Sequence, residues 1–314
     1  IYSTYLGGSN TAHECVTDIC INSADEAYVT GFTNSADFPT TAGCFQAAHA
    51  GSTETFVTKL NANGTALLYS TFIGGTNYDI GGAIAVNTAG EAYITGATAS
   101  ANYPTTAGAY DITLGGSGDF FVSRFNAAGT GLVFSTYVGG SGGEGGYDIV
   151  LNAEGAPLIA GGGIGTDFPA TNCAVDETDN GSAEIMVFRL DVNGTRLDYG
   201  TYIGGNHKDY TNTTIYAYGP CGREEVWVSC TAHSLDFPTT PGTFQSTKLN
   251  GQNDQPVVFK FNPPVVNPGF TFDPDPACNV PIQFTDTMVH CGLSVSYTHL
   301  RAHETKANLV CRLL

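Results

Sequence analysis

The sequence has few basic residues, almost no methionine and no long apolar segment. Lysine and arginine together number 11 against 29 acidic residues, which gives a formal net charge of −18 at pH 7. Nucleic acids and anionic lipids bind basic surfaces, so this charge argues against both as partners. The chain has no run of 18 apolar residues, so we predict no transmembrane helix and no membrane insertion.

The residues that are abundant favour strands and tight turns. The 314 residues include 40 glycines, 18 phenylalanines and 16 tyrosines. Strands are rich in aromatic and β-branched residues, and glycine is common in the turns between them, so the composition indicates an all-β protein. The chain starts at Ile1 without a signal-peptide pattern. We therefore expect an internal stretch of a larger exported protein, with its export signal upstream.

Three motifs recur four times in the same order, about 65 residues apart. The first, Tyr-Ser-Thr-Tyr-Leu-Gly-Gly and its variants, occupies residues 2–8, 69–75, 134–140 and 199–205. The second, Asp-Phe-Pro-Thr-Thr and its variants, occupies residues 37–41, 102–106, 167–171 and 236–240. The third, typified by Phe-Val-Thr-Lys-Leu-Asn, occupies residues 56–61, 121–126, 186–191 and 258–262.

Each repeat contains the pattern of four short strands. In the second repeat they are expected at residues 82–87, 91–97, 119–126 and 132–138. Turns such as Asn63-Gly64 join them, because Asn and Gly accept positive φ. Four antiparallel strands per repeat, without helical periodicity, predict a β-propeller of four-stranded blades over residues 1–263.

The last repeat lacks a fourth strand of its own. Its expected strands lie near residues 213–218, 224–231 and 256–262, and Pro263-Pro264 follows. Residues 1–6 carry a spare copy of the fourth-strand motif. We therefore expect residues 1–6 to be the outer strand of the last blade, since closing the ring in this way removes two open sheet edges.

The three motifs resemble the β-propeller repeat (SBBP) family of secreted proteins from gliding bacteria. After them, residues 264–293 resemble the opening of an immunoglobulin-like PKD module, through Phe270-Thr271-Phe272-Asp273-Pro274 and the segment 280–286. Residues 294–314 resemble a translated sequencing adapter, and we give them no functional interpretation. The resemblance implies an extracellular or outer-surface protein. We expect a monomer that serves adhesion or binds a glycan or another cell-surface ligand.

Features shared by all repeats are expected to be structural, and features that differ are expected to carry function. The recurring basic residue at positions 59, 124, 189 and 260 is either one of a ring of ligand-binding charges or a strut within each blade, and we favour the strut. Eight cysteines outside the tail are not repeat-equivalent. In an exported protein they predict disulfides, with free buried thiols as the alternative.

Any ligand is expected on the face that carries the long, variable loops. The candidate residues in these loops are His49, Asp176, Asp179, His207, Asp209 and Tyr210. The acidic stretch from Asp176 to Gly181 ends in glycine, as a calcium loop can, but it does not fit the EF-hand spacing. We favour a surface turn there, with calcium as the weaker alternative and no other cofactor.

The alternative function is a carbohydrate-active enzyme, a glycan lyase or hydrolase, with its site at the central channel of the propeller. The segment 139–143 formally matches the G-x-S-x-G nucleophile motif, but that motif requires a helix after the serine. No helix is expected there, so we predict that the protein is not an enzyme and name no catalytic residue.

Overall fold

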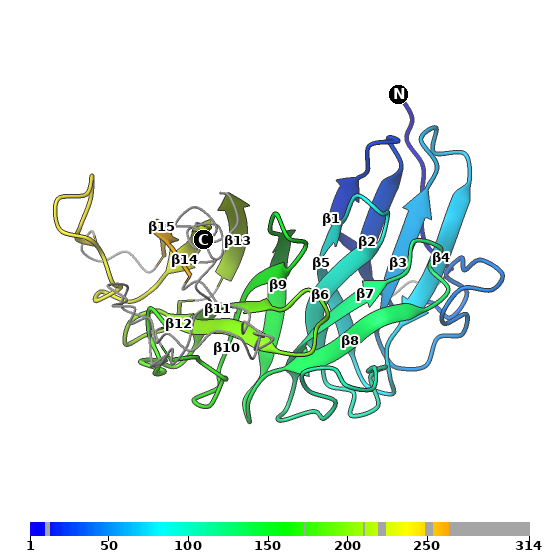
Figure 1. The fold of residues 1–314 in the computed structure, drawn as a ribbon. Coiled ribbons are helices and arrows are strands. Elements are labelled where there is room, and N and C mark those ends of the chain that lie inside the picture. Colours follow the sequence, from blue (N-terminus) through cyan, green and yellow to red (C-terminus); the bar gives the residue numbers. More distant parts are fainter. Residues whose placement is uncertain (10–12, 173, 210, 219–223, 249–253, 264–314) are drawn as a thin grey trace, which may run out of the picture. The chain divides into compact units, whose positions relative to one another are not determined.

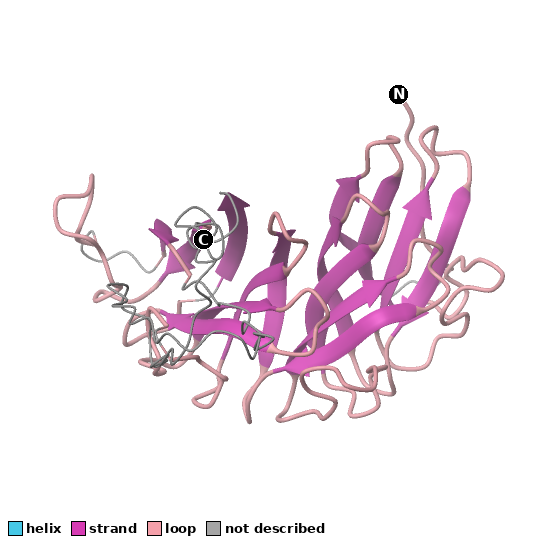
Figure 2. Cartoon of the chain, viewed as in Figure 1, coloured by secondary structure: helices cyan, strands magenta, loops and turns pink. Residues whose placement is uncertain are grey.

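The computed structural model describes residues 1–9, 13–172, 174–209, 211–218, 224–248 and 254–263. These residues form fifteen strands and no helix (Figure 1 and Figure 2). This part of the chain therefore has no helix long and apolar enough to cross a membrane. Residues 1–263 form one compact unit. The predicted PKD-like segment, 264–293, and the tail, 294–314, lie outside the described residues.

The strands form four antiparallel sheets, each with its strands in chain order. Sheet 1 contains β1 (Glu14–Ile21), β2 (Ala27–Thr33), β3 (Glu54–Leu60) and β4 (Leu67–Ile73). Sheet 2 contains β5 (Asp79–Val86), β6 (Ala92–Thr98), β7 (Asp119–Phe125) and β8 (Leu132–Val138). Sheet 3 contains β9 (Glu144–Leu151), β10 (Pro157–Gly163), β11 (Glu184–Leu190) and β12 (Leu197–Ile203). Sheet 4 contains β13 (Thr211–Tyr218), β14 (Glu225–Ala232) and β15 (Gln255–Phe261).

The prediction of one antiparallel sheet per repeat is confirmed, and the strands of the second repeat lie within three residues of their expected bounds. Most of the difference is in β5, which begins at Asp79 rather than at residue 82. A β-bulge between Gly81 and Ala83 lets the chain pair with β6 on both sides of the irregularity. A strand interrupted in this way is not visible as a continuous alternating pattern.

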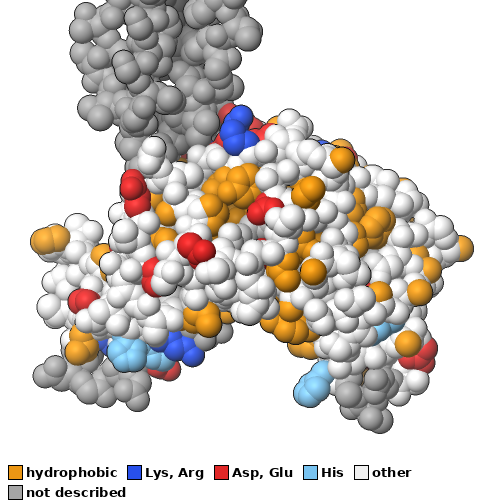
Figure 3. Space-filling view, turned by 90° about the horizontal axis from the view of Figure 1, so that it is seen from below, with side chains coloured by type: hydrophobic (Ala, Val, Ile, Leu, Met, Phe, Trp, Pro, Cys, Tyr) orange, Lys and Arg blue, Asp and Glu red, His pale blue; other side chains and the backbone are white. Residues whose placement is uncertain are grey.

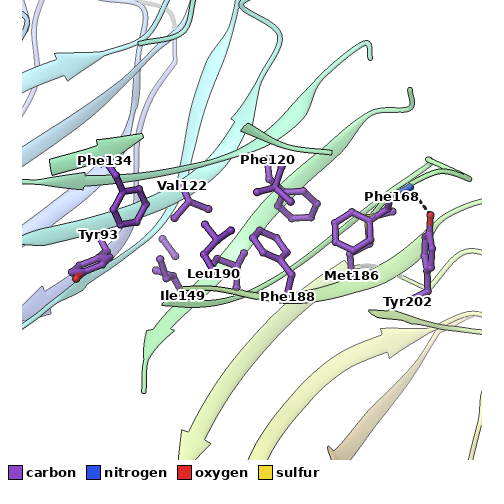
Figure 4. Close-up of a cluster of buried hydrophobic side chains, with 13 residues drawn as sticks. Tyr93, Phe120, Val122, Phe134, Ile149, Phe168, Met186, Phe188, Leu190 and Tyr202 are labelled. Carbon is purple, nitrogen blue, oxygen red and sulfur yellow. Dashed lines mark hydrogen bonds between the residues drawn. The ribbon is translucent and has the colours of Figure 1, made fainter. Parts of the chain in front are cut away.

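The four sheets pack in sequence. The first strands of the sheets contact one another in the order β1, β5, β9 and β13, and second strands contact the first strand of the next sheet. The side chains between sheets 2 and 3 illustrate the packing (Figure 4). There the rings of Phe120 and Phe188 lie with their centroids 5.0 Å apart. Apolar residues on both faces of a strand are therefore buried, which removes the simple polar–apolar alternation.

A glycine turn and an aromatic ring join sheets 2 and 3 each to the sheet before it. Gly129, in the turn after β7, has a φ of 67°, and a Cβ there would lie 2.4 Å from the ring of Tyr69 on β4. Phe134 on β8 covers Gly194 in the same way. Positive φ and close aromatic contact together require glycine at this turn.

The N-terminal segment occupies the corresponding place against sheet 1. The ring of Tyr2 covers Gly64, and Leu6 packs on the apolar cluster of sheet 1. Residues 1–8 form no strand, however. The expectation that residues 1–6 form the outer strand of the last sheet is therefore wrong for this structure. The contact of Tyr2 with the turn of sheet 1 was not predicted from the sequence.

Candidate functional site

The long connections lie at the end of the unit where each first strand begins. They are the described residues of the loops between second and third strands (34–53, 99–118, 164–172, 174–183, 233–248 and 254) and of the links between sheets (74–78, 139–143 and 204–209). We call this end the long-loop face. In Figure 3, which views the molecule from this end, acidic side chains lie singly among mostly uncharged surface.

In sheets 1, 2 and 4, a carboxylate at or just before the start of the first strand holds the Gly-Gly link beside it. Asp79 accepts the backbone N–H of Gly75 at 2.7 Å, the hydroxyl of Ser100 at 2.9 Å and the hydroxyl of Thr98. In sheet 1, Glu14 accepts the N–H of Gly8 and the hydroxyl of Thr33. We call this arrangement the clasp. It fixes the backbone of the link, so the repeated acidic residue is structural.

A second acceptor fixes the residue after Gly-Gly. The N–H groups of Ser9, Thr76, Ser141 and Asn206 donate to the side chains of Asp37, Asn102, Asp167 and Asp236, at 2.8–3.0 Å. The acceptors are the Asp or Asn that precedes Phe/Tyr-Pro in each repeat. This explains why that residue recurs.

The clasp of sheet 3 departs from the others. Glu144 stands where sheet 2 has Asp79, but Gly163 and Gly165 replace the threonine and serine whose hydroxyls would bind it. Its side chain is buried, at 3% exposure, and neither carboxylate oxygen has a hydrogen-bond partner at normal geometry. Burial, with a further contribution from the nearby Asp119, raises the pKa of Glu144 to about 7, although the N–H groups of Gly140 and Gly142 act in the opposite direction.

A second buried carboxylate gathers several predicted ligand residues around it. Glu184 is fully buried, and burial raises its pKa to about 7, with contributions from Asp179, Asp176 and Asp209. Its Oε1 accepts the N–H of Asn180 at 2.5 Å, while Oε2 has no partner. Three of the six candidate residues are therefore close to one site, at the junction of sheets 3 and 4.

These three acidic residues are engaged in backbone turns. Asp209 is buried and accepts hydrogen bonds from the backbone N–H groups of Gly205, His233 and Ser234. Asp176 accepts the N–H of Thr178 at 2.9 Å, and Asp179 accepts the N–H of Gly181 at 3.2 Å. Within the described ranges, no three His, Cys, Asp or Glu side chains converge to hold a metal ion.

The two histidines among the candidates have different surroundings. The side chain of His49 is 9% exposed; its ring packs edge-on against Phe72, and Nε2 lies 3.2 Å from the carbonyl of Thr33. His207 is exposed on the link between sheets 3 and 4. Tyr210 lies outside the described residues. Of the six candidates, His207 is the one whose side chain is described and exposed.

The recurring basic residues are struts, as favoured from the sequence. The ammonium of Lys59 lies 2.7 Å from Glu26 and over the ring of Tyr28, and Arg124 pairs with Glu91 over Tyr93. Lys260 pairs with Glu225 within sheet 4 in the same way. Arg189 of sheet 3 instead pairs with Glu224 of sheet 4, because its own sheet has Ala156 at the position of the acidic residue. The strut within one sheet therefore holds in three repeats, and the acidic partners were not identified from the sequence.

Two acidic residues on first strands were missed from the sequence. Asp18 accepts the backbone N–H of Ile84 on the next sheet, and Asp148 does the same for Ile215, each at 2.8 Å. Burial raises the pKa of Asp148, the two backbone N–H bonds lower it, and Asp18 raises it further. The Asp-Ile pair at 18–19 and 148–149 is a signal that recurs in alternate repeats.

The cysteines that the structure describes are unpaired: Cys15, Cys20, Cys44 and Cys230. The expected disulfides are therefore wrong for these four residues. Burial raises the thiol pKa of both Cys20 and Cys230 to about 12. Both side chains pack against apolar clusters between sheets, where cysteine acts as a small hydrophobic residue.

The G-x-S-x-G match has a structural explanation. Ser141 donates its N–H and its hydroxyl to Asp167, and β9 follows it directly. A serine nucleophile of this motif requires a following helix. No protein-family model matches the chain, and no curated protein matches its sequence.

Proposed function

We propose that residues 1–263 are blades of an exported β-propeller of the SBBP type, whose long-loop face binds a glycan or another ligand on a cell surface. The recurring motifs and the antiparallel sheets support the propeller. The PKD-like sequence that follows and the acidic composition support an extracellular or outer-surface location. On this proposal the protein is an adhesion or binding module.

One observation carries the binding proposal. Tyr78, Gly143 and Lys208 occupy the same backbone position, and each forms the same parallel bridge to the loop before the third strand. The same bridge holds the backbone in all three sheets, while the side chain changes from an aromatic ring to none and then to a cation. A rigid frame that presents different side chains at one position is typical of a binding surface.

The side chains at these positions suit a neutral or anionic sugar. Tyr78 is 43% exposed, and His207 and Lys208 are exposed on the equivalent link. Aromatic rings stack on the apolar face of a sugar, and a cation with an imidazole can bind hydroxyl or carboxylate groups. Because Asp209 is buried in the clasp, we assign it a supporting role rather than a ligand contact.

The test is a glycan array probed with the full chain and then with variants. The double variant His207→Ala with Lys208→Ala should lose most binding to any glycan that the wild type retains. Asn193→Ala, which changes an exposed turn at the opposite end of sheet 3, should bind as the wild type does. An equal loss of binding in both variants would contradict a ligand site on this face. So would a wild-type chain that binds no glycan and no cell surface.

A glycan lyase or hydrolase is the second candidate, and the two acidic residues on first strands favour it. The charge of Asp18, on sheet 1, contributes to the raised pKa of Asp148, on sheet 3, and carboxylate pairs perform acid–base chemistry on glycosidic bonds. The Asp18→Asn and Asp148→Asn variants should each abolish polysaccharide cleavage if this candidate is correct. Cleavage that survives both substitutions would exclude these residues.

A further inference from the structure

The last sheet has an open edge where the other sheets have a fourth strand. Among the described residues, β15 pairs with β14 alone. Val57, Val122 and Val187 pack in the apolar clusters between successive sheets and are fully buried, whereas the equivalent Val258 belongs to none of these clusters and is 68% exposed. An open edge of this kind is a template for another strand.

The loop that would cover a fourth strand is nevertheless in place. In sheet 1, β4 lies between β3 and this loop, with Phe72 donating its N–H to the carbonyl of Gln46 at 3.0 Å. Thr71 accepts the N–H of Gln46 at 2.8 Å. Sheets 2 and 3 repeat both bonds through Asp111 and Asp176. The equivalent residue of sheet 4, Gln245, lies on an exposed part of its loop.

A groove of about 560 Å³ lies between β15 and this loop. Phe237, Phe244 and Lys248 line it from the loop, and Val258 lines it from the strand. The ring of Phe244 is fully exposed to solvent. The groove thus offers an unpaired strand edge on one side, a loop on the other and apolar side chains between them.

Residues 2–6 carry the fourth-strand motif but form no strand in the structure. Residues 2–6 have the sequence of the fourth strand and lie against the turn of sheet 1, where Tyr2 covers Gly64. Tyr5 is fully exposed, whereas the equivalent Phe72, Tyr137 and Tyr202 are at most 1% exposed. Tyr2 therefore makes the contact that is usual for this motif, whereas Tyr5 is not buried as its equivalents are.

We propose that the groove along β15 accepts residues 2–6 from a second copy of this chain as the fourth strand of sheet 4. The mode is strand addition to a sheet edge, with main-chain bonds for affinity and side-chain pockets for specificity. Every substantial contact between described strands of different sheets joins consecutive sheets, and none joins sheet 4 to sheet 1. This favours a second copy over the same chain, and a head-to-tail pair over the expected monomer.

The pairing register follows from the repeats. Thr71 lies opposite Val57, Thr136 opposite Val122 and Thr201 opposite Val187. The equivalent pair in the proposed contact is Thr4 of one copy opposite Val258 of the other. Tyr5 would then donate its N–H to the carbonyl of Gln245, as Phe72 does to Gln46.

Disulfide trapping in the full chain tests this register. Chains of residues 1–314 carrying Thr4→Cys are mixed with differently tagged chains carrying Val258→Cys under mild oxidation. Residues directly opposite in a sheet have Cα atoms about 4.5–5.5 Å apart, within the range for a disulfide. We expect a mixed covalent dimer well above the level that the native cysteines give with either variant alone. Thr65→Cys, on an exposed turn of sheet 1, replaces Thr4→Cys as the matched control.

A competing peptide tests whether the groove itself binds the fourth-strand sequence. An octapeptide with the sequence of residues 1–8 should suppress the dimer, and the same peptide with proline in place of Thr4 should not, because proline lacks the N–H. Failure of both the cross-link and the competition would contradict the proposal that the groove binds residues 2–6. If the double variant Thr4→Cys with Val258→Cys forms a cross-link within one chain that is unchanged on dilution, the proposal that a second copy supplies the strand would be wrong.

Discussion

The buried carboxyl of Glu144 should make the stability of the protein fall as pH rises. Its pKa is about 7 in the folded chain and about 4.5 when exposed, because burial and the nearby Asp119 disfavour its charged form. A carboxyl with a raised folded pKa binds more protons in the folded state, so its favourable contribution is complete below pH 4.5 and is lost by pH 7. A difference of this size corresponds to about 3 kcal/mol in the free energy of unfolding.

Glu144→Gln removes this titration while keeping the size of the side chain. Urea unfolding followed by circular dichroism at pH 5, 6, 7 and 8 measures the effect. We expect the variant and the wild type to differ little at pH 5, and the variant to be more stable at pH 8 by a large part of that value. Glu154→Gln, at an exposed turn, serves as the matched control and should follow the wild type. Identical pH slopes for Glu144→Gln and the wild type would refute the reasoning.

The aromatic contact on the turns predicts that Gly129→Ala destabilises the protein by about 2–3 kcal/mol, since it adds a clash with Tyr69 to the strain of positive φ. Gly108→Ala, at the same kind of φ but with open space around it, should cost about 1 kcal/mol, and equal melting temperatures for the two variants would contradict the contact. Alkylation of the folded protein at pH 8 should modify the exposed Cys15 and spare the buried Cys230, whose thiol pKa is raised to about 12; modification of Cys230 at the same rate would contradict its burial.

The strands could be predicted because repetition compensated for weak local patterns. Buried segments such as β6 and β7 do not alternate, yet four copies of each motif fixed their limits to within a few residues. The strut of Lys59 was foreseen as structural for the same reason, although its partner Glu26 was not. A repeated residue has a repeated environment, and that can be recognised without coordinates.

The site was harder to predict because its properties depend on burial. Asp209 is acidic and lies in a variable link, which suggested exposure, but three backbone N–H groups hold it inside the clasp. The raised pKa of Glu144 could not be predicted from the sequence, because the loss of its hydroxyl partners is visible only when Gly163 and Gly165 are placed beside it. Residues that are distant in sequence set the charge state of a carboxyl, and composition alone does not bring them together.

The aromatic ring that covers the glycine of the next turn has a consequence for how such proteins evolve. Tyr2, Tyr69 and Phe134 make the same contact from successive repeats, so each boundary between neighbours is made of equivalent residues. A duplicated or deleted repeat would therefore find a compatible neighbour on both sides, as in other modular arrays where each unit contacts only the adjacent ones. Gene duplication can then change the length of the array in whole units, without new mutations at the junctions.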